Sequence, residues 1–184
     1  CNTVMVPASG TRIIDPNTGE TVPVGTIGEF CTRGYHVMLG YFEMPEATAA
    51  ARLPVVHGNR AAELGDFFHV AGVPDGEVHV SGDLSRVKHV GAGMSAGRLV
   101  VHGRVGMHLG TRMTGGEIVV EGDAGDWVGS DMGGGRIVVR GNAGHLVGSA
   151  VRGERMGMQG GEILVLGSAG NEVGGGMRRG LVAI

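Results

Sequence analysis

A glycine-rich repeat with a period of about 19 residues is the feature that most constrains how this chain folds. Segments that begin at Arg98, Glu117 and Arg136 each open with a short run of Leu, Ile and Val and then turn through glycines. Glycine recurs at fixed positions of the repeat, as in Gly103, Gly122, Gly141 and Gly167, or in Gly110, Gly129, Gly148 and Gly174. A fixed period of this size is typical of solenoid proteins, in which each repeat packs on its neighbours.

Each repeat carries an apolar run of only three to five residues, too short to bury a face by itself. Stacked copies of such a run pair about 4.8 Å apart, and glycine allows the tight corners between them. No segment shows the 3.6-residue apolar period of a helix. We therefore expect an all-β fold, a right-handed parallel β-helix of about five glycine-rich coils over residues 76–184, with an irregular, β-rich N-terminal segment.

Two further columns of the repeat support this register. Stacked neighbours would alternate in charge at the position that holds Arg98, Glu117, Arg136 and Glu162. Methionine recurs at another position, in Met94, Met113, Met132, Met158 and Met177. The step from Arg136 to Glu162 is longer than the regular repeat, which predicts a seven-residue insertion close to 153–159.

Residues 1–51 lie outside the repeat and begin at Cys1 rather than Met, so we expect the chain to be a piece of something longer. The turn-rich string DPNTGETVPVG, residues 15–25, predicts a hairpin. Residues 52–75 are interpreted as a capping segment. Leu64, Phe67 and Phe68 in it would cover the open first coil, because the end of a solenoid is an exposed strand edge.

Composition excludes several classes of function. The net charge of −3 provides no positive electrostatic field that would attract nucleic acid. The sequence contains no run of about 18 apolar residues, so no membrane-spanning helix is predicted. The two cysteines, Cys1 and Cys31, form no disulfide framework, so we expect a reducing, cytoplasmic setting.

No motif for catalysis, metal binding or cofactor binding stands out. The glycine strings contain no GxxxxGK[ST] phosphate loop and are interpreted as coil corners. Eight histidines occur without HExxH or CxxC spacing, at His36, His57, His69, His79, His89, His102, His108 and His145. Asp123, Asp126 and Asp131 leave a carboxylate cluster open as an alternative, although a solvated surface is favoured. We therefore assign no catalytic, metal or cofactor residue.

The best functional candidates are surface groups. Aromatic, Met and Arg side chains are enriched at protein interfaces. We expect a partner to contact Trp127, His108, Arg155, Met156, Arg178 and Arg179. The alternative is a solvated face and a plain loop.

The string GEFCTRGYHVMLGYF at residues 28–42, followed by EMPEAT, resembles the acyl-adenylate-forming ligases. The phosphate loop, the TGD aspartate and the C-terminal lysine of that family are missing. We therefore expect residues 1–51 to be a ligase fragment joined to a different protein near 49–53, by fusion, assembly error or design. A capping segment that resembles a ligase by chance is the alternative.

The insertion RGERMGM at 152–158 and the ending AGNEVGGGMRRGL at 169–181 resemble the C-type subunit of formylmethanofuran dehydrogenase and of the related formyltransferase/hydrolase complex. So do LPVVHGNR at 53–60 and GDLSRVKHVGAGM at 82–94. The resemblance implies a non-catalytic scaffold that binds subunits of types A, B and D. A methanofuran-type carrier, a metal and in some cases molybdopterin would then belong to those partners, and none to this chain.

Two other functions stay open at this stage. The C-terminal β-helix of glutamate synthase shares the glycine repeat, so the chain would then be a spacer domain. A remnant of an AMP-forming acyl ligase is the second alternative. The open ends of the solenoid also predict self-association.

Overall fold

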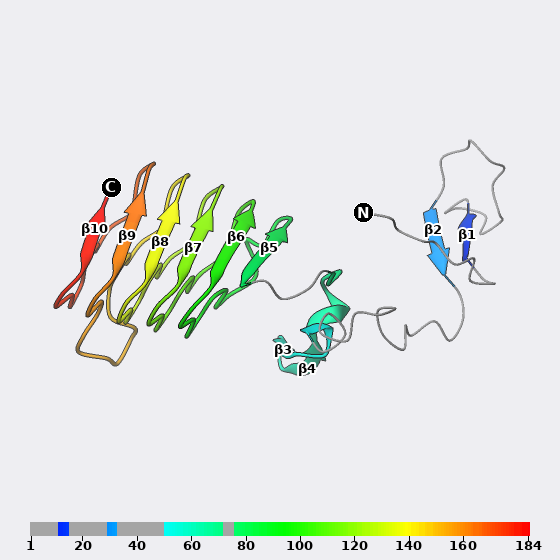
Figure 1. Cartoon of the computed structure of the whole chain (residues 1–184), viewed down its shortest axis with the longest axis horizontal. Helices are drawn as coiled ribbons and strands as arrows, with labels where there is room; N and C mark the ends of the chain where they lie inside the picture. Colours follow the sequence, from blue (N-terminus) through cyan, green and yellow to red (C-terminus); the bar gives the residue numbers. More distant parts are fainter. Residues whose placement is uncertain (1–10, 15–28, 33–49, 72–75) are drawn as a thin grey trace. The chain divides into compact units, whose positions relative to one another are not determined.

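The structure, a computed structural model, describes residues 11–14, 29–32, 50–71 and 76–184. The chain divides into two compact units, Cys1–Val73 and Pro74–Ile184, and Figure 1 draws the strands of each. The all-β class expected from the sequence is confirmed, since the named elements of the described ranges are ten strands and one short 3-10 helix.

In the first unit, β1 (Thr11–Ile14) pairs antiparallel with β2 (Glu29–Thr32). The two strands flank the predicted turn at 15–25, which itself lies outside the described residues. Of the ligase-like string at 28–42, only the four residues of β2 are described.

The capping segment forms a second hairpin. β3 (Pro54–His57) pairs antiparallel with β4 (Arg60–Glu63), and the turn between them holds Gly58 at φ 65°. The 3-10 helix η1 (Leu64–Asp66) follows, and the backbone N–H of Glu63 donates to the Asp66 carboxylate at 2.9 Å. That Leu64, Phe67 and Phe68 cover the first coil stays a prediction.

The second unit is the parallel β-helix that the repeat predicts. Six strands lie side by side in chain order, in one parallel sheet (Figure 1). They are β5 (Glu77–Ser81), β6 (Arg98–His102), β7 (Glu117–Val120), β8 (Arg136–Val139), β9 (Glu162–Val165) and β10 (Leu181–Ala183). Five coils were expected, and the sixth strand arises because β10 opens one more repeat.

Only one side of each coil is a true strand. A second side is held by single parallel bridges that link Leu84, Val105, Ala124, Ala143 and Ala169 from coil to coil. Glycines lie two residues before and one residue after Val105, Ala124, Ala143 and Ala169, and the turns at these glycines keep the extended run short. The coil is therefore a chain of short straight steps and tight corners.

The interior is made of stacked columns of like side chains. Ile118 and Ile137 of adjacent strands pair in register, and both are fully buried. Met113, Met132 and Met158 are also fully buried. Their backbones stack directly, since the Gly133 N–H donates to the Met113 carbonyl at 2.8 Å. The predicted alignment of the methionines is confirmed, and repetition lets one packing solution serve every coil.

Glycine is required where the corner turns back over the core. Gly110 has a φ of 62°, and a Cβ added there would lie 2.6 Å from the Ile137 Cδ1 atom. The left-handed backbone and the close approach of the isoleucine column together disfavour a larger residue at this position. The same column contains Gly129 and Gly148, which also have left-handed backbones.

The predicted charge alternation runs along the outer face of the sheet. Arg98 lies 3.0 Å from Glu77 and 2.9 Å from Glu117. Arg136 then lies 3.8 Å from both Glu117 and Glu162. These five side chains form a continuous ladder of opposite charges, which confirms the register and penalises any slip by one coil.

We expect reversal of charge at the centre of this ladder to destabilise the solenoid. Glu117→Lys would place three cations in a row, at a cost of about 1 kcal/mol that salt partly removes. Thermal unfolding at low and high salt measures the effect. Glu117→Gln is the control, and equal stability of the two variants at low salt would show that the ladder contributes nothing.

Candidate partner-binding surface

One corner of every coil is occupied by a non-glycine residue in the left-handed conformation. The φ values are 61° for His89, 65° for His108, 59° for Trp127, 64° for Leu146 and 61° for Glu172. Such a backbone costs an L-residue about 1–2 kcal/mol. The cost is offset by hydrogen bonds between coils, such as the one from the Trp127 N–H to the His145 carbonyl at 2.9 Å.

This corner stacks three aromatic rings. The rings of His89 and His108 lie 4.7 Å apart at 10°, and those of His108 and Trp127 lie 5.2 Å apart at 15°. His108 and Trp127 are half-buried. The His108 Nδ1 and Trp127 Nε1 atoms are buried and have no hydrogen-bond partner among the described residues. The stack therefore leaves two polar atoms unsatisfied in this part of the chain.

The stack also changes how His108 titrates. Burial lowers the pKa of His108 below its ordinary value of 6.5, His89 and Lys88 act in the same direction, and Asp126 opposes them. The folded protein therefore resists a proton that the unfolded chain accepts. Stability contributed by the neutral ring is present above pH 6.5 and is lost as the pH falls below it.

We expect His108→Asn to reduce the loss of stability on acidification, because asparagine tolerates the left-handed backbone and does not titrate. Denaturant unfolding of both proteins at about pH 7.5 and about pH 5.5 measures the difference. An equal loss in both proteins would contradict a neutral His108 in the fold.

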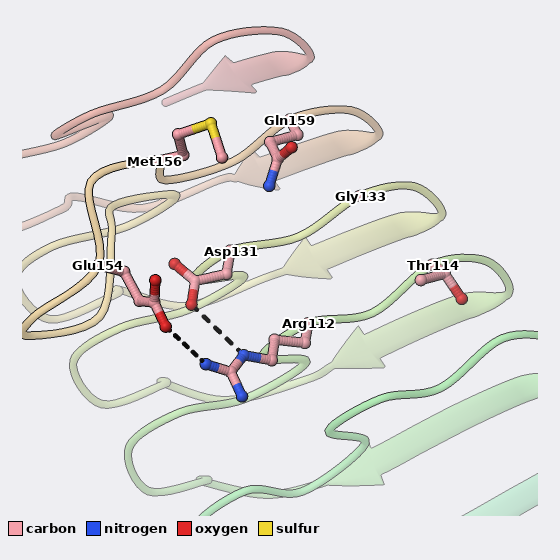
Figure 2. Close-up of a pocket in the computed structure, with 7 residues that line it drawn as sticks. All are labelled: Arg112, Thr114, Asp131, Gly133, Glu154, Met156 and Gln159. Atoms are coloured by element: carbon pink, nitrogen blue, oxygen red, sulfur yellow. Dashed lines mark hydrogen bonds and ion pairs between the residues drawn. The ribbon is translucent and has the colours of Figure 1, made fainter.

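The insertion predicted near 153–159 is a loop pinned back onto earlier coils. The Asp131 carboxylate accepts the Val151 N–H at 3.1 Å and lies 3.5 Å from Arg112. Arg112 also reaches Glu154 in the loop, at 3.3 Å. Figure 2 shows the Arg112 guanidinium between the two carboxylates. Arg112 thus links the insertion to the regular stacked coils, which form the wall of the solenoid.

Two open hollows border this bridge. The first has a volume of about 490 Å³ and is lined by Thr114, Met156 and Gln159 as well as the bridged charges (Figure 2). The second, of about 460 Å³, is lined by His89, His108 and Val151. Arg112 lines both. The predicted interface residues His108 and Met156 therefore lie beside two hollows that share one arginine.

The remaining residues proposed from the sequence for an interface lie on the insertion and the last coil. Arg155 and Met156 are exposed on the loop, and Arg178 and Arg179 are exposed just before β10. The Arg178 N–H donates to the Met158 carbonyl at 2.8 Å, which joins the loop to the last coil. Trp127 and His108, on the left-handed corner, contact each other.

The three aspartates that the sequence left open as a carboxylate cluster each have a separate structural role. Asp123 accepts the Asn142 N–H, and Asp126 accepts the His145 N–H, each at 2.8 Å. Asp131 anchors the insertion instead. Each carboxylate thus supports the coil above it. In the part of the chain that the structure describes, no group of three or more His, Cys, Asp or Glu residues is placed to hold a metal ion.

A polar chain on the outer face of β5–β7 was not predicted from the repeat. His79 Nδ1 lies 2.8 Å from His102 Nε2, and His102 Nδ1 lies 2.9 Å from the Glu121 carboxylate. The hydrogen bond from His102 lowers the pKa of Glu121. The register alone would have placed Glu121 above His102, because both residues occupy the same repeat position. His79 is in register with Val100 rather than His102, so its contact with His102 could not be predicted from the repeat.

No helix in the described ranges is long and apolar enough to span a membrane. No protein-family model matches the chain. The chain is 45% identical over 68 residues to the C-type subunit of the molybdenum-containing formylmethanofuran dehydrogenase 1 of Methanothermobacter thermautotrophicus, in an alignment that covers 36% of this chain and 17% of the relative. It therefore spans about a sixth of the length of that relative.

Among solved structures, a chain of the formyltransferase/hydrolase complex (FhcABCD) from Methylorubrum extorquens, in complex with methylofuran, superimposes with a TM-score of 0.70. Identity is 35%, and the match covers 73% of this chain and 51% of that chain. The chain is also 39% identical over 62 residues to an acyl-CoA ligase of Ajellomyces capsulatus, in an alignment that covers 34% of this chain and 10% of the ligase. Both resemblances expected from the sequence are thereby confirmed: the chain is similar to the C-type subunit of formylmethanofuran dehydrogenase, and a shorter stretch is similar to acyl-CoA ligases.

Proposed function

We propose that this chain is the β-helical part of a C-type subunit in a formyl-group-processing complex, and that it serves as a scaffold for other subunits. The observation that carries the proposal is the structural match at 35% identity over 73% of the chain. At this identity the match supports a relationship as well as a shared fold. The partners would be subunits of types A, B and D, assembled in the cytoplasm.

The hydrogen bonds made by polar side chains of the solenoid support a scaffold that has no catalytic site of its own. Asp123 and Asp126 accept backbone N–H groups of the next coil. Ser149 donates to the Glu172 carbonyl at 2.6 Å and accepts the Gly175 N–H. These side chains therefore hold neighbouring coils together, a structural role that supports the scaffold assignment. A methanofuran-type carrier, metal or pterin would then be held by the partners.

Co-expression with A-, B- and D-type subunits tests this assignment. We expect the chain to co-purify with them in a fixed ratio. Purified alone, it should show no formyl transfer, hydrolysis or dehydrogenation, and no bound metal by elemental analysis. Turnover by the isolated chain, or failure to co-purify, would each contradict the proposal.

Association through the open end of the sheet is a further part of the proposal. Leu181 and Ile184 are 55% and 60% exposed at the end of the chain that holds β10, and no described strand pairs with the far edge of β10. An exposed apolar edge favours added strands. Sedimentation of the isolated chain over a range of concentrations tests this, and a monomer throughout would exclude it.

The match to acyl-CoA ligases favours a second candidate for the N-terminal region, a remnant of an adenylating enzyme. The ATP-binding and catalytic motifs of that family are missing from the sequence. We therefore expect no exchange of pyrophosphate into ATP with any carboxylic acid. Measurable exchange would restore the ligase interpretation.

A further inference from the structure

The structure points to one cationic docking surface made by the insertion and the last coil, and we propose that it binds an acidic segment of a partner protein. Its groups are Arg152, Arg155, Arg178 and Arg179, with Met156 among them. If the partner is another subunit of the complex, this inference rests on the function proposed above. The binding chemistry itself does not.

The first support is the backbone geometry that joins the two segments. The Gly157 N–H donates to the Gly176 carbonyl at 2.9 Å, and the Arg178 N–H donates to the Met158 carbonyl at 2.8 Å. A Cβ added to Gly176 would lie 3.3 Å from the Arg155 carbonyl oxygen. The arginines of the loop and of the last coil are thus brought together although a whole coil of sequence separates Arg155 from Arg178.

The second support is that these charges are not neutralised within the described chain. All four side chains are exposed, and none forms an ion pair with a described carboxylate. By contrast, Arg98, Arg104 and Arg136 each form an ion pair with a carboxylate of a neighbouring coil. Exposed cations gathered without counter-charges raise the local potential and attract an anionic partner.

The third support is that the nearby carboxylates do not form ion pairs with these arginines. Glu154, the carboxylate of the loop, is engaged by Arg112 on the wall at 3.3 Å. Glu162 lies 3.8 Å from Arg136, and Glu172 makes no ion pair with a described residue. The ion pair with Arg112 therefore points Glu154, the one acidic residue of the insertion, toward the earlier coils. The arginines of the loop remain available to bind a partner.

The chemistry of the surface favours a protein over a nucleic acid. Met156, which directly follows Arg155 in the insertion, is 48% exposed, and Met with Arg is typical of protein interfaces. Arginine forms paired hydrogen bonds with a carboxylate. The whole chain has a net charge of −3, which opposes the broad electrostatic attraction on which nucleic-acid binding depends.

The test compares two charge-matched double variants of the full chain. Arg155→Glu/Arg178→Glu reverses two charges on the proposed surface, and Arg86→Glu/Arg140→Glu reverses two exposed arginines elsewhere on the solenoid. Binding is measured to the A-, B- and D-type subunits and to a glutamate-rich peptide. We expect the surface variant to bind each at least about tenfold more weakly, a loss that corresponds to about 1.4 kcal/mol, and the control variant to bind as the parent does.

The outcomes separate the two proposals. If the parent binds the subunits and both variants do so equally well, the cationic surface is wrong while the scaffold function stands. If the parent binds no subunit but binds the peptide through these arginines, the scaffold function is wrong and the surface stands. Tighter binding to duplex DNA than to the peptide, or equal peptide binding by both variants, would overturn the inference. Thermal unfolding verifies that each variant is folded.

Discussion

Gly134→Ala is expected to lower the free energy of unfolding of the solenoid by about 3 kcal/mol, at the upper end of the cost of overpacking. A Cβ at this position would lie 2.5 Å from the Thr114 carbonyl oxygen and 3.3 Å from the Thr114 carbonyl carbon. Both atoms belong to the backbone of the coil below, so no side-chain rotation can relieve the contact. Two coils would have to separate.

The neighbouring glycine provides a matched control. A Cβ on Gly133 would find its nearest atoms 3.9 Å away, at ordinary contact distance. Gly133→Ala should therefore be neutral or stabilise the fold by about 0.5 kcal/mol, because alanine restricts the unfolded chain. That unfolded-state effect is common to both variants, so their difference isolates the clash. Denaturant unfolding measures it, and equal stabilities would show that glycine does not set the spacing of the coils.

The fold was accessible from the sequence because stacking imposes a translational pattern on the chain. Residues one coil apart share the same environment, so Met113 and Met132 fall in one buried column and Glu117 falls between two arginines. Glycine marks the places where one coil touches the next. These constraints repeat, and repetition is what a single sequence reveals most directly.

The left-handed corner was hidden because its residues share no chemistry. His89, Trp127, Leu146 and Glu172 have the same backbone conformation, and apart from histidine none is a residue type that is enriched in it. Closure of the coil imposes the conformation, and hydrogen bonds between coils maintain it. The sequence indicated His108 and Trp127 only as interface candidates, because ring stacking follows from a backbone conformation that the residue types do not indicate.

Of the proposed cationic surface, Arg155, Met156, Arg178 and Arg179 were interface candidates in the sequence, whereas Arg152 and the arrangement of the groups were not predicted. Arg155 and Arg178 were singled out by composition, whereas their approach follows from backbone hydrogen bonds of an irregular loop. The bridge from Arg112 to Glu154 joins positions far apart in the sequence and belongs to the insertion, which the other coils lack. Interactions that occur once leave no periodic signal, which is why the contacts of the insertion could not be predicted from the repeat.

Asp131→Ala is expected to release the insertion from the wall and to speed tryptic cleavage after Arg152 and Arg155 by about 100-fold. The Asp131 side chain is only 9% exposed and accepts the Val151 N–H at 3.1 Å. Losing a hydrogen bond to a charged group costs about 2 kcal/mol. Alanine at a φ of 53° adds about 1 kcal/mol of backbone strain.

Asp131→Asn separates these contributions, because asparagine keeps an acceptor for Val151 and tolerates the left-handed backbone. We expect its cleavage rate to stay within about fivefold of the parent. Glu154→Gln removes only the exposed ion pair with Arg112, worth at most about 1 kcal/mol, and should have a comparably small effect. Cleavage of the alanine variant at the parental rate would mean that the backbone bonds of Gly157 and Met158 hold the loop by themselves. In that case the arginine surface would not depend on Asp131, and the Asp131 carboxylate would stabilise only the regular coils.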